Sequence, residues 1–316
     1  MILTWSSPLA DRFRNLDVRD GVLLRGPAGW AEFSPFWDYD DAECVPWLRA
    51  AVEAATLPFP DAVRTSVPVN ATVPAVGPER AAEIVRASGC ATVKVKVAQA
   101  GQSLADDLDR VAAVRDALGP AGAIRVDANA AWSVDEAVAA LPRIDRAAGG
   151  LQYAEQPCAA VDDLARVRRA VAVPIAADES IRRASDPHAV VRAEAADVIV
   201  VKVQPLGGVR ACLALAEELG LPVTVSSALE SSVGVAAGVA LAAALPRTNA
   251  AGLATVAMLR ADVAATPLLP VDGELPVGRV VPDAITPAAP DLDRAWRDRL
   301  DRVAALAGID LQEVLA

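Results

Sequence analysis

Three acidic residues and three lysines stand at the ends of short apolar segments in the middle of the chain. They are Asp127, Glu155, Asp178, Lys94, Lys96 and Lys202. Converging carboxylates repel one another unless a cation neutralises them, and carboxylate oxygens are ligands that Mg²⁺ prefers. A lysine that is buried or crowded by another ammonium group loses its proton more easily and can act as a base near neutral pH. The set therefore predicts metal-assisted proton abstraction from a small-molecule carboxylate substrate.

Lys94 and Lys96 belong to residues 92–97, where valines and lysines alternate. In a β-strand this period places the valines on one face and the lysines on the other, about 7 Å apart. Alone, the pattern is typical of an edge strand exposed to solvent. Strands that alternate with helices, however, form parallel sheets covered on both faces. We therefore expect both lysines to point into an interior or to emerge at a site where the strand ends.

From residue 66 onward, short apolar segments alternate with amphipathic ones. Strands are predicted at residues 67–73, 92–97, 124–127, 151–155, 174–178, 198–203, 222–226 and 252–255. Helices are predicted at residues 78–88, 103–118, 133–147, 161–171, 185–194, 208–219 and 231–244. This order predicts an α/β fold, a (β/α)7β TIM-like barrel over residues 66–260. Such barrels carry their chemistry at the C-terminal ends of the strands, where the acids and lysines stand.

The two ends of the chain do not follow this alternation. Residues 23–25 and 29–33 predict a hairpin, and residues 40–56 predict a helix. We expect residues 1–65 to form part of an α+β capping domain. The C-terminal tail, residues 261–316, is rich in proline and ends in a predicted helix at residues 292–307. We expect that helix to pack back on the N-terminal segment and complete the cap.

Composition narrows the functional classes. The chain has 316 residues, 53% hydrophobic and 22% charged, which is typical of a globular protein. A net charge of −11 argues against a nucleic-acid partner. The sequence has neither an apolar run of about 20 residues nor a signal peptide, so we expect no membrane partner and a soluble cytoplasmic protein. The four cysteines lack CxxC spacing, which predicts free thiols. Nothing in the sequence predicts the oligomeric state.

Simpler explanations exist for each polar residue taken singly. Any one of the acids is more simply a surface residue or a helix cap. Three acids at successive strand ends, flanked by lysines on both sides, argue against that explanation. The only histidine, His188, falls on a predicted helix, and we expect it to be structural or solvated.

These residues resemble the enolase superfamily in its muconate-lactonising branch. The matching motifs are Lys94-Val95-Lys96, Asp127-Ala128-Asn129, Glu155-Gln156-Pro157, Asp178-Glu179-Ser180 and Lys202. The likeness spans the whole chain, including a capping domain and a (β/α)7β barrel. Within the branch, residues 125–130, 226–232 and 252–255 are most similar to the o-succinylbenzoate synthases.

The resemblance implies a Mg²⁺-dependent lyase of menaquinone biosynthesis, with Mn²⁺ as a possible substitute. Its reaction is the syn-dehydration of 2-succinyl-6-hydroxy-2,4-cyclohexadiene-1-carboxylate to o-succinylbenzoate through an enediolate. The implied metal ligands are Asp127, Glu155 and Asp178. Lys96 would act as base and then acid, while Lys202 would stay protonated and stabilise the enediolate. The expected substrate-binding residues are Lys94, Arg125, Asn129, Ser226 and Ser227. A structural ion pair in the barrel is an equally good role for Arg125.

Other functions fit the same residues. An N-succinylamino-acid racemase and a muconate cycloisomerase share the metal site and the lysines. A dipeptide epimerase is disfavoured, because residues 255–259 contain no Asp-x-Asp to bind a substrate amine. A metal-dependent binding protein, or an inactive barrel kept for assembly, is an alternative from a different class. The loop residues Phe13, Arg14 and Asn15 are candidates for contact with the distal part of the substrate.

Overall fold

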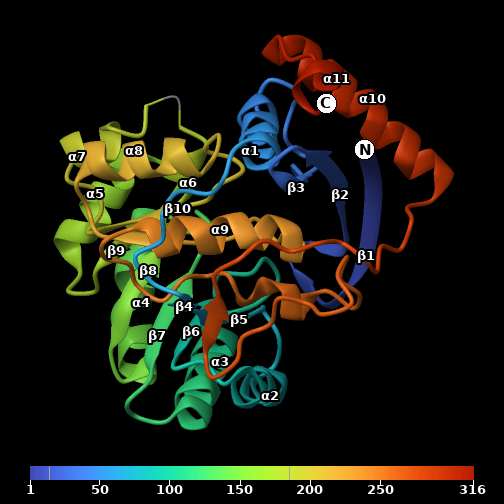
Figure 1. Cartoon of the computed structure of the whole chain (residues 1–316). Helices are drawn as coiled ribbons and strands as arrows, with labels where there is room; N and C mark the ends of the chain where they lie inside the picture. The colour runs from blue at the N-terminus through green and yellow to red at the C-terminus, as the bar shows by residue number, and fades with distance from the viewer. Residues whose placement is uncertain (14, 185) are drawn as a thin grey trace.

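The computed structural model of the chain describes residues 1–13, 15–184 and 186–316. A curled parallel sheet forms the centre of the molecule, with helices packed on its outer face (Figure 1). A smaller antiparallel sheet from the N-terminus lies beside the last long helix of the chain (Figure 1). No helix in the described part of the chain is long and apolar enough to cross a membrane. The cytoplasmic location stays a prediction.

The parallel sheet has the strand order β11-β10-β9-β8-β7-β6-β5. Its strands are β5 (Asn70–Val73), β6 (Thr92–Lys96), β7 (Ala123–Asp127), β8 (Leu151–Glu155), β9 (Ile175–Ala177), β10 (Val198–Val201) and β11 (Val223–Val225). The intervening helices are α2 (Pro78–Ser88), α3 (Leu104–Leu118), α4 (Val134–Ala148), α5 (Val161–Ala170), α6 (Glu179–Arg182), α7 (Ala189–Arg192), α8 (Val209–Leu219) and α9 (Ser232–Ala244). This alternation confirms the predicted α/β barrel fold class.

Only two residues represent the eighth strand of the barrel. Ala251 forms a parallel bridge with Val69, and Gly252 forms one with Ser226. These two bridges close the ring between β5 and β11. The chain then turns into the 3-10 helix η1 (Ala254–Met258), so the predicted strand at residues 252–255 is wrong beyond Gly252.

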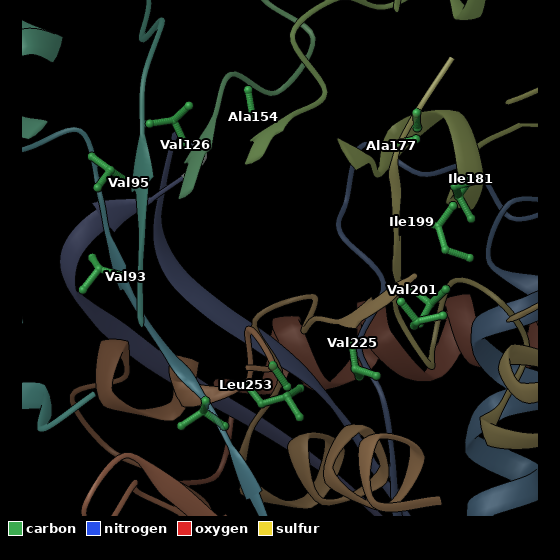
Figure 2. Close-up of a cluster of buried hydrophobic side chains, with 14 of the residues drawn as sticks. Val93, Val95, Val126, Ala154, Ala177, Ile181, Ile199, Val201, Val225 and Leu253 are labelled. Atoms are coloured by element: carbon green, nitrogen blue, oxygen red, sulfur yellow. The ribbon is translucent and has the colours of Figure 1, made fainter. Parts of the chain in front are cut away.

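Alternation along the parallel strands separates an aliphatic outer face from a polar inner face. The aliphatic set includes Val93, Val95, Val126, Ile199 and Val201 (Figure 2). These side chains belong to the large core shared with the surrounding helices. Lys94 and Lys96 point the other way and are only 6% and 9% exposed. The expectation that both lysines point into an interior is therefore confirmed.

The N-terminal strands β1 (Ile2–Phe13), β2 (Leu16–Gly26) and β3 (Gly29–Phe33) form an antiparallel sheet, followed by α1 (Val45–Thr56). The C-terminal helix α10 (Pro290–Ala307) lies beside this sheet (Figure 1). Its fully buried Trp296 donates from Nε1 to Asp20 Oδ1 over 2.8 Å and meets the Phe33 ring edge-on at 6.0 Å. We call β1–β3, α1, the residues between β3 and α1, and α10 the capping layer. The domain boundaries 1–65, 66–260 and 261–316 stay a prediction.

Several predicted boundaries differ from the structure. The predicted strand at residues 67–73 is two strands, β5 and β4 (Ser66–Pro68), because β4 pairs antiparallel with β12 (Glu274–Pro276) of the tail. The predicted helix at residues 40–56 begins only at Val45, since residues 41–44 form turns. The predicted helix at residues 185–194 is the short α7, and its expected first residue, Ser185, lies outside the described residues. A short helix, α11 (Leu311–Val314), follows α10.

All four cysteines are buried free thiols. Burial raises the pKa of Cys44 and of Cys158 to about 11, and it also raises the pKa of Cys90 and of Cys212. A thiol reacts through its thiolate, so these side chains are inert at neutral pH.

Candidate active site

Six charged side chains meet where the parallel strands end. Asp127 and Glu155 are the last residues of β7 and β8, and Lys96 is the last residue of β6. Asp178 and Lys202 directly follow β9 and β10. Together with Lys94 they form the group that we call the rim. The chain contains only three lysines, and all three belong to the rim.

The acids and lysines of the rim are hydrogen-bonded to one another. Lys94 Nζ lies 3.0 Å from both carboxylate oxygens of Glu155 and 3.3 Å from Asp127 Oδ2. Lys96 Nζ lies 2.5 Å from Asp127 Oδ2, and Lys202 Nζ lies 2.6 Å from Asp178 Oδ2. The structure therefore brings together all six residues that the sequence singles out.

The three carboxyl groups are at most 1% exposed, so their charges depend on their neighbours. Burial and the charge of Asp127 raise the pKa of Glu155 to about 7, and Lys94 offsets this only in part. Burial opposes ionisation of the other two acids as well, but the lysines outweigh it at Asp127 and lower its pKa. At Asp178, Arg182 and Lys202 together lower the pKa in the same way.

The lysines of the rim fall into two kinds. Burial lowers the pKa of Lys96, although Asp127 partly offsets it, and it lowers the pKa of Lys202 against the effect of Asp178. Burial acts on Lys94 too, but the carboxylates of Glu155 and Asp127 outweigh it and raise the pKa of Lys94. Lys94 is thus held as an ammonium ion, whereas Lys96 and Lys202 are closer to losing a proton.

The donor set of the rim fits a hard divalent cation. Within the described residues, no three His, Cys, Asp or Glu side chains stand ready as a metal-ligand cluster, because the rim acids bond to ammonium groups instead. Yet Asp127, Glu155 and Asp178 are buried carboxylates from three adjacent strands, and burial together with the charges of the other two acids raises the pKa of Glu155. Such oxygen ligands suit Mg²⁺ or a similar ion.

Two cavities that share lining residues open at the rim. The larger, about 630 Å³, is lined by Arg12 and Phe13 at the end of β1, by Asn15, and by residues 96–100, 128–129 and 131. The smaller, about 30 Å³, is lined by Lys96, Lys202, Asn129, Ser226 and Ser227, among others. Of the three residues expected in a loop, Phe13 instead ends β1, Phe13 and Asn15 line the cavity, and Arg14 is outside the described residues.

Asn129 and the two serines are placed for contact with a ligand. Asn129 Oδ1 accepts a hydrogen bond from Lys96 Nζ over 2.6 Å. Ser227 shares a hydrogen bond of 2.7 Å with Thr255 of η1. Ser226 bridges to Gly252 at the closure of the barrel and lines the smaller cavity.

Arg125 is not among the residues that line these two cavities, so its contacts favour a structural role, and its binding of a substrate stays a prediction. It is fully buried, and its Nη1 donates to Asn70 Oδ1 at 2.8 Å and to the Ala250 carbonyl at 2.7 Å. It thereby ties β7 to β5 and to the residues that close the barrel. The side chain of His188 is 46% exposed, in agreement with the solvated role expected for it.

Sequence reasoning missed a residue that contacts the rim and a second residue that contacts the first. Arg182 of α6 donates from Nε to Asp178 Oδ1 over 3.0 Å, and Tyr39 of the capping layer accepts a hydrogen bond from Arg182. The spacing of four residues between Asp178 and Arg182 on a helix is a signal that predicts the first contact. No local signal predicts Tyr39, because its contact depends on how the N-terminal segment docks.

Two family models match the chain. A model described as enolase C-terminal domain-like matches residues 78–285, and one described as enolase N-terminal domain-like matches residues 4–55.

Curated relatives match over most of the chain. The o-succinylbenzoate synthase of Thermobifida fusca is 63% identical over 295 residues, which cover 93% of this chain and 92% of that protein. The o-succinylbenzoate synthase of Mycolicibacterium smegmatis is 52% identical over 94% of this chain and 92% of that protein.

Among solved structures, the L-Ala-D/L-Glu epimerase from Bacillus subtilis matches with a TM-score of 0.75 over 92% of this chain and 98% of that chain. At 24% identity, that likeness concerns the fold alone.

Proposed function

The chain belongs to the enolase superfamily, and from that membership we propose that it has the activity of an o-succinylbenzoate synthase. The substrate is 2-succinyl-6-hydroxy-2,4-cyclohexadiene-1-carboxylate, and the product is o-succinylbenzoate, an intermediate of menaquinone biosynthesis. The reaction removes the proton α to the ring carboxylate and the hydroxyl group on the neighbouring carbon. Together these leave as water, and the ring becomes aromatic, which supplies much of the driving force.

The observation that carries the proposal is the position of two lysines on opposite sides of one cavity. Lys96 ends β6 and Lys202 follows β10, and these strands are four places apart in the sheet order. Both lysines line the smaller cavity, but only Lys96 also lines the larger one. Substrate bound between them presents one face to each amine, which is the arrangement that proton transfer needs.

We assign a different role to each lysine. Lys96 takes the α-proton at its Nζ and then delivers it to the departing hydroxyl group on the same face, as a syn-dehydration requires. Lys202 stays protonated, and its ammonium group stabilises the negative charge that develops on the carboxylate oxygens. Asn129 holds Lys96 Nζ in place through its side-chain oxygen. Ser226 and Ser227 contact the substrate from the opposite wall of the cavity.

Membership of the superfamily implies a divalent metal, and we propose that it is Mg²⁺, with Mn²⁺ able to replace it. Asp127, Glu155 and Asp178 would hold it. When bound, the ion neutralises the substrate carboxylate and so stabilises charge as it develops there.

The test is an assay of the full-length protein after exhaustive treatment with EDTA. We expect the loss of absorbance of the cyclohexadiene substrate to stop after chelation and to resume when Mg²⁺ is added. Activity that survives thorough chelation would contradict the metal-assisted reaction. An absence of turnover with Mg²⁺ would instead favour a binding protein or an inactive barrel.

Because both lysines line one cavity, racemisation of an N-succinylamino acid is a second candidate activity. The two reactions are separated by Lys202→Arg, which keeps the positive charge but cannot exchange a proton near neutral pH. We expect this variant to keep part of the dehydration activity and to lose racemisation. An equal loss of both activities would contradict the separate roles of the two lysines.

A further inference from the structure

A buried arginine connects an acid of the rim to the capping layer. Arg182 lies one helical turn after Asp178, and its Nε donates to Asp178 Oδ1 over 3.0 Å. Its Nη2 donates to Glu179 Oε1, and its Nη1 donates to the hydroxyl oxygen of Tyr39. All three arms of the guanidinium group are therefore engaged, and the side chain is only 2% exposed.

The two oxygens of Asp178 have different partners. Oδ1 accepts from Arg182, while Oδ2 accepts from Lys202 Nζ over 2.6 Å. A carboxylate that is hydrogen-bonded at one oxygen cannot rotate freely about the Cβ–Cγ bond of the aspartate. Arg182 therefore fixes the plane of the group so that Oδ2, and not Oδ1, meets Lys202.

Tyr39 is itself held by contacts with the helices α1 and α10. It lies between β3 and α1 and is 4% exposed. Its ring meets Trp47 of α1 at 5.3 Å, with the two planes 76° apart. Its carbonyl oxygen accepts a hydrogen bond of 2.6 Å from Arg299 Nη2 of α10. The hydroxyl group that meets Arg182 is thus fixed by packing in the capping layer, far along the chain from the barrel strand it serves.

We propose that Arg182 and Tyr39 are positioning residues that orient the Asp178 carboxylate toward Lys202 and toward the divalent metal. Tyr39 acts through Arg182: its hydroxyl group fixes the guanidinium plane, and the guanidinium group fixes the carboxylate. The capping layer therefore helps to orient an acid of the rim, and it also lines part of the larger cavity. This inference rests on the proposed function, because it concerns the same metal and the same lysine.

The variants Tyr39→Phe and Arg182→Lys test the proposal in the full-length protein. Tyr39→Phe removes the hydroxyl oxygen and keeps the packing of the ring. Arg182→Lys keeps the positive charge but removes the planar guanidinium group with its several N–H donors. The matched control is Arg115→Lys. The guanidinium group of Arg115 also donates several hydrogen bonds, to the carbonyl groups of Ala148, Gly119 and Gly122, but none of them goes to a rim residue. The readouts are Mn²⁺ binding measured by electron paramagnetic resonance, thermal unfolding, and kcat and KM with Mg²⁺.

We expect Arg182→Lys to weaken Mn²⁺ binding about 10- to 100-fold, the usual effect of removing a hydrogen-bond partner from a metal ligand. We expect Tyr39→Phe to weaken it about three- to tenfold, with an unfolding temperature close to that of the wild type. The double variant should bind Mn²⁺ as Arg182→Lys does, since Tyr39 acts on Asp178 through Arg182. Arg115→Lys should leave Mn²⁺ binding unchanged.

The outcomes are distinguishable. Mn²⁺ affinity within twofold of wild type in both single variants would overturn the inference and leave the proposed function intact. Fully additive losses in the double variant would overturn the relay from Tyr39 through Arg182. Wild-type protein that binds no Mn²⁺ would overturn the metal-assisted function and this inference with it. If Arg182→Lys does not fold, Tyr39→Phe alone decides, because its packing is preserved.

Discussion

Lys94 differs from the other two lysines of the rim because its ammonium group is shared between two acids. It contacts both oxygens of Glu155 and one oxygen of Asp127, and its pKa is raised although the side chain is buried. The sequence predicts that Lys94 binds substrate, yet these contacts point to a fixed counter-charge for the acids. Alternation along a strand predicts that Lys94 and Lys96 share a face, but it does not predict which of them bonds to which acid.

Replacing Lys94 by methionine should therefore destabilise the metal-free protein. Removal of one partner from a buried ion pair costs about 3–5 kcal/mol, because the remaining charge is left uncompensated. We expect a loss of that size in the free energy of unfolding by urea, and a smaller loss when Mg²⁺ is present, since a ligand that binds only the native state stabilises it.

The control is Arg166→Met, which breaks an exposed ion pair with Asp163. Exposed pairs contribute about 0–1 kcal/mol, so this variant should unfold nearly as the wild type does. Equal effects of the two substitutions would contradict a counter-charge role for Lys94.

At the scale of secondary structure, the barrel is closed by the least regular of its elements. Gly252 bridges Ser226, the residue after β11, at a position where a side chain would collide, since a Cβ would lie 2.7 Å from Ser226 Oγ and 3.4 Å from Ser226 Cβ. Close approach of the Ser226 side chain thus explains glycine at this place. It also couples the closure of the barrel to a serine that lines the cavity.

Gly252→Ala should lower stability by about 1–3 kcal/mol, the usual cost of forcing an extra methyl group into a packed site. It should also reduce turnover, because Ser226 must move to admit the methyl group. Thermal unfolding and the dehydration assay measure the two effects. Gly278→Ala is the matched control, since a Cβ there meets nothing within 4 Å. A Gly252→Ala variant as stable and active as this control would contradict the close contact.

The sequence predicts elements with strong periodicity well and elements that depend on distant partners poorly. α2 and β8 have the predicted bounds, because Pro78 opens the first and alternation marks the second. β1 was missed, because its regularity comes from pairing with β2 and not from its own sequence. At the site, the acids and lysines follow from their places at strand ends, whereas Tyr39 meets Arg182 only through the docking of the capping layer.

At the scale of the whole molecule, a pair of buried glutamates lies where the capping layer meets the barrel. Glu32 of β3 accepts hydrogen bonds from the backbone of Ser231 at 3.1 Å and of Gly234 at 3.2 Å, at the start of α9. Burial and the charge of Glu32 raise the pKa of its neighbour Glu230 to about 7, which Arg19 of β2 offsets only in part. Burial raises the pKa of Glu32 as well.

This pair predicts a pH dependence of stability. The ordinary pKa of a glutamate is 4.5, so the raised pKa of Glu230 means that its protonated form favours the folded state. That contribution is complete below pH 4.5 and is lost as the pH rises through about 7. Glu230→Gln stays neutral, so its unfolding temperature should gain on that of the wild type between about pH 5 and about pH 8. The exposed Glu313→Gln should show no such gain, and an equal pH profile for Glu230→Gln and wild type would contradict the prediction.

The confinement of all three lysines to the rim has a practical consequence. An endoprotease that cuts only after lysine has three target bonds in the whole chain, and each lies beside a residue less than 10% exposed. Cleavage by such an enzyme requires the end of a barrel strand to detach. Fragments of defined mass would therefore record the opening of this one region, without any label having to be introduced.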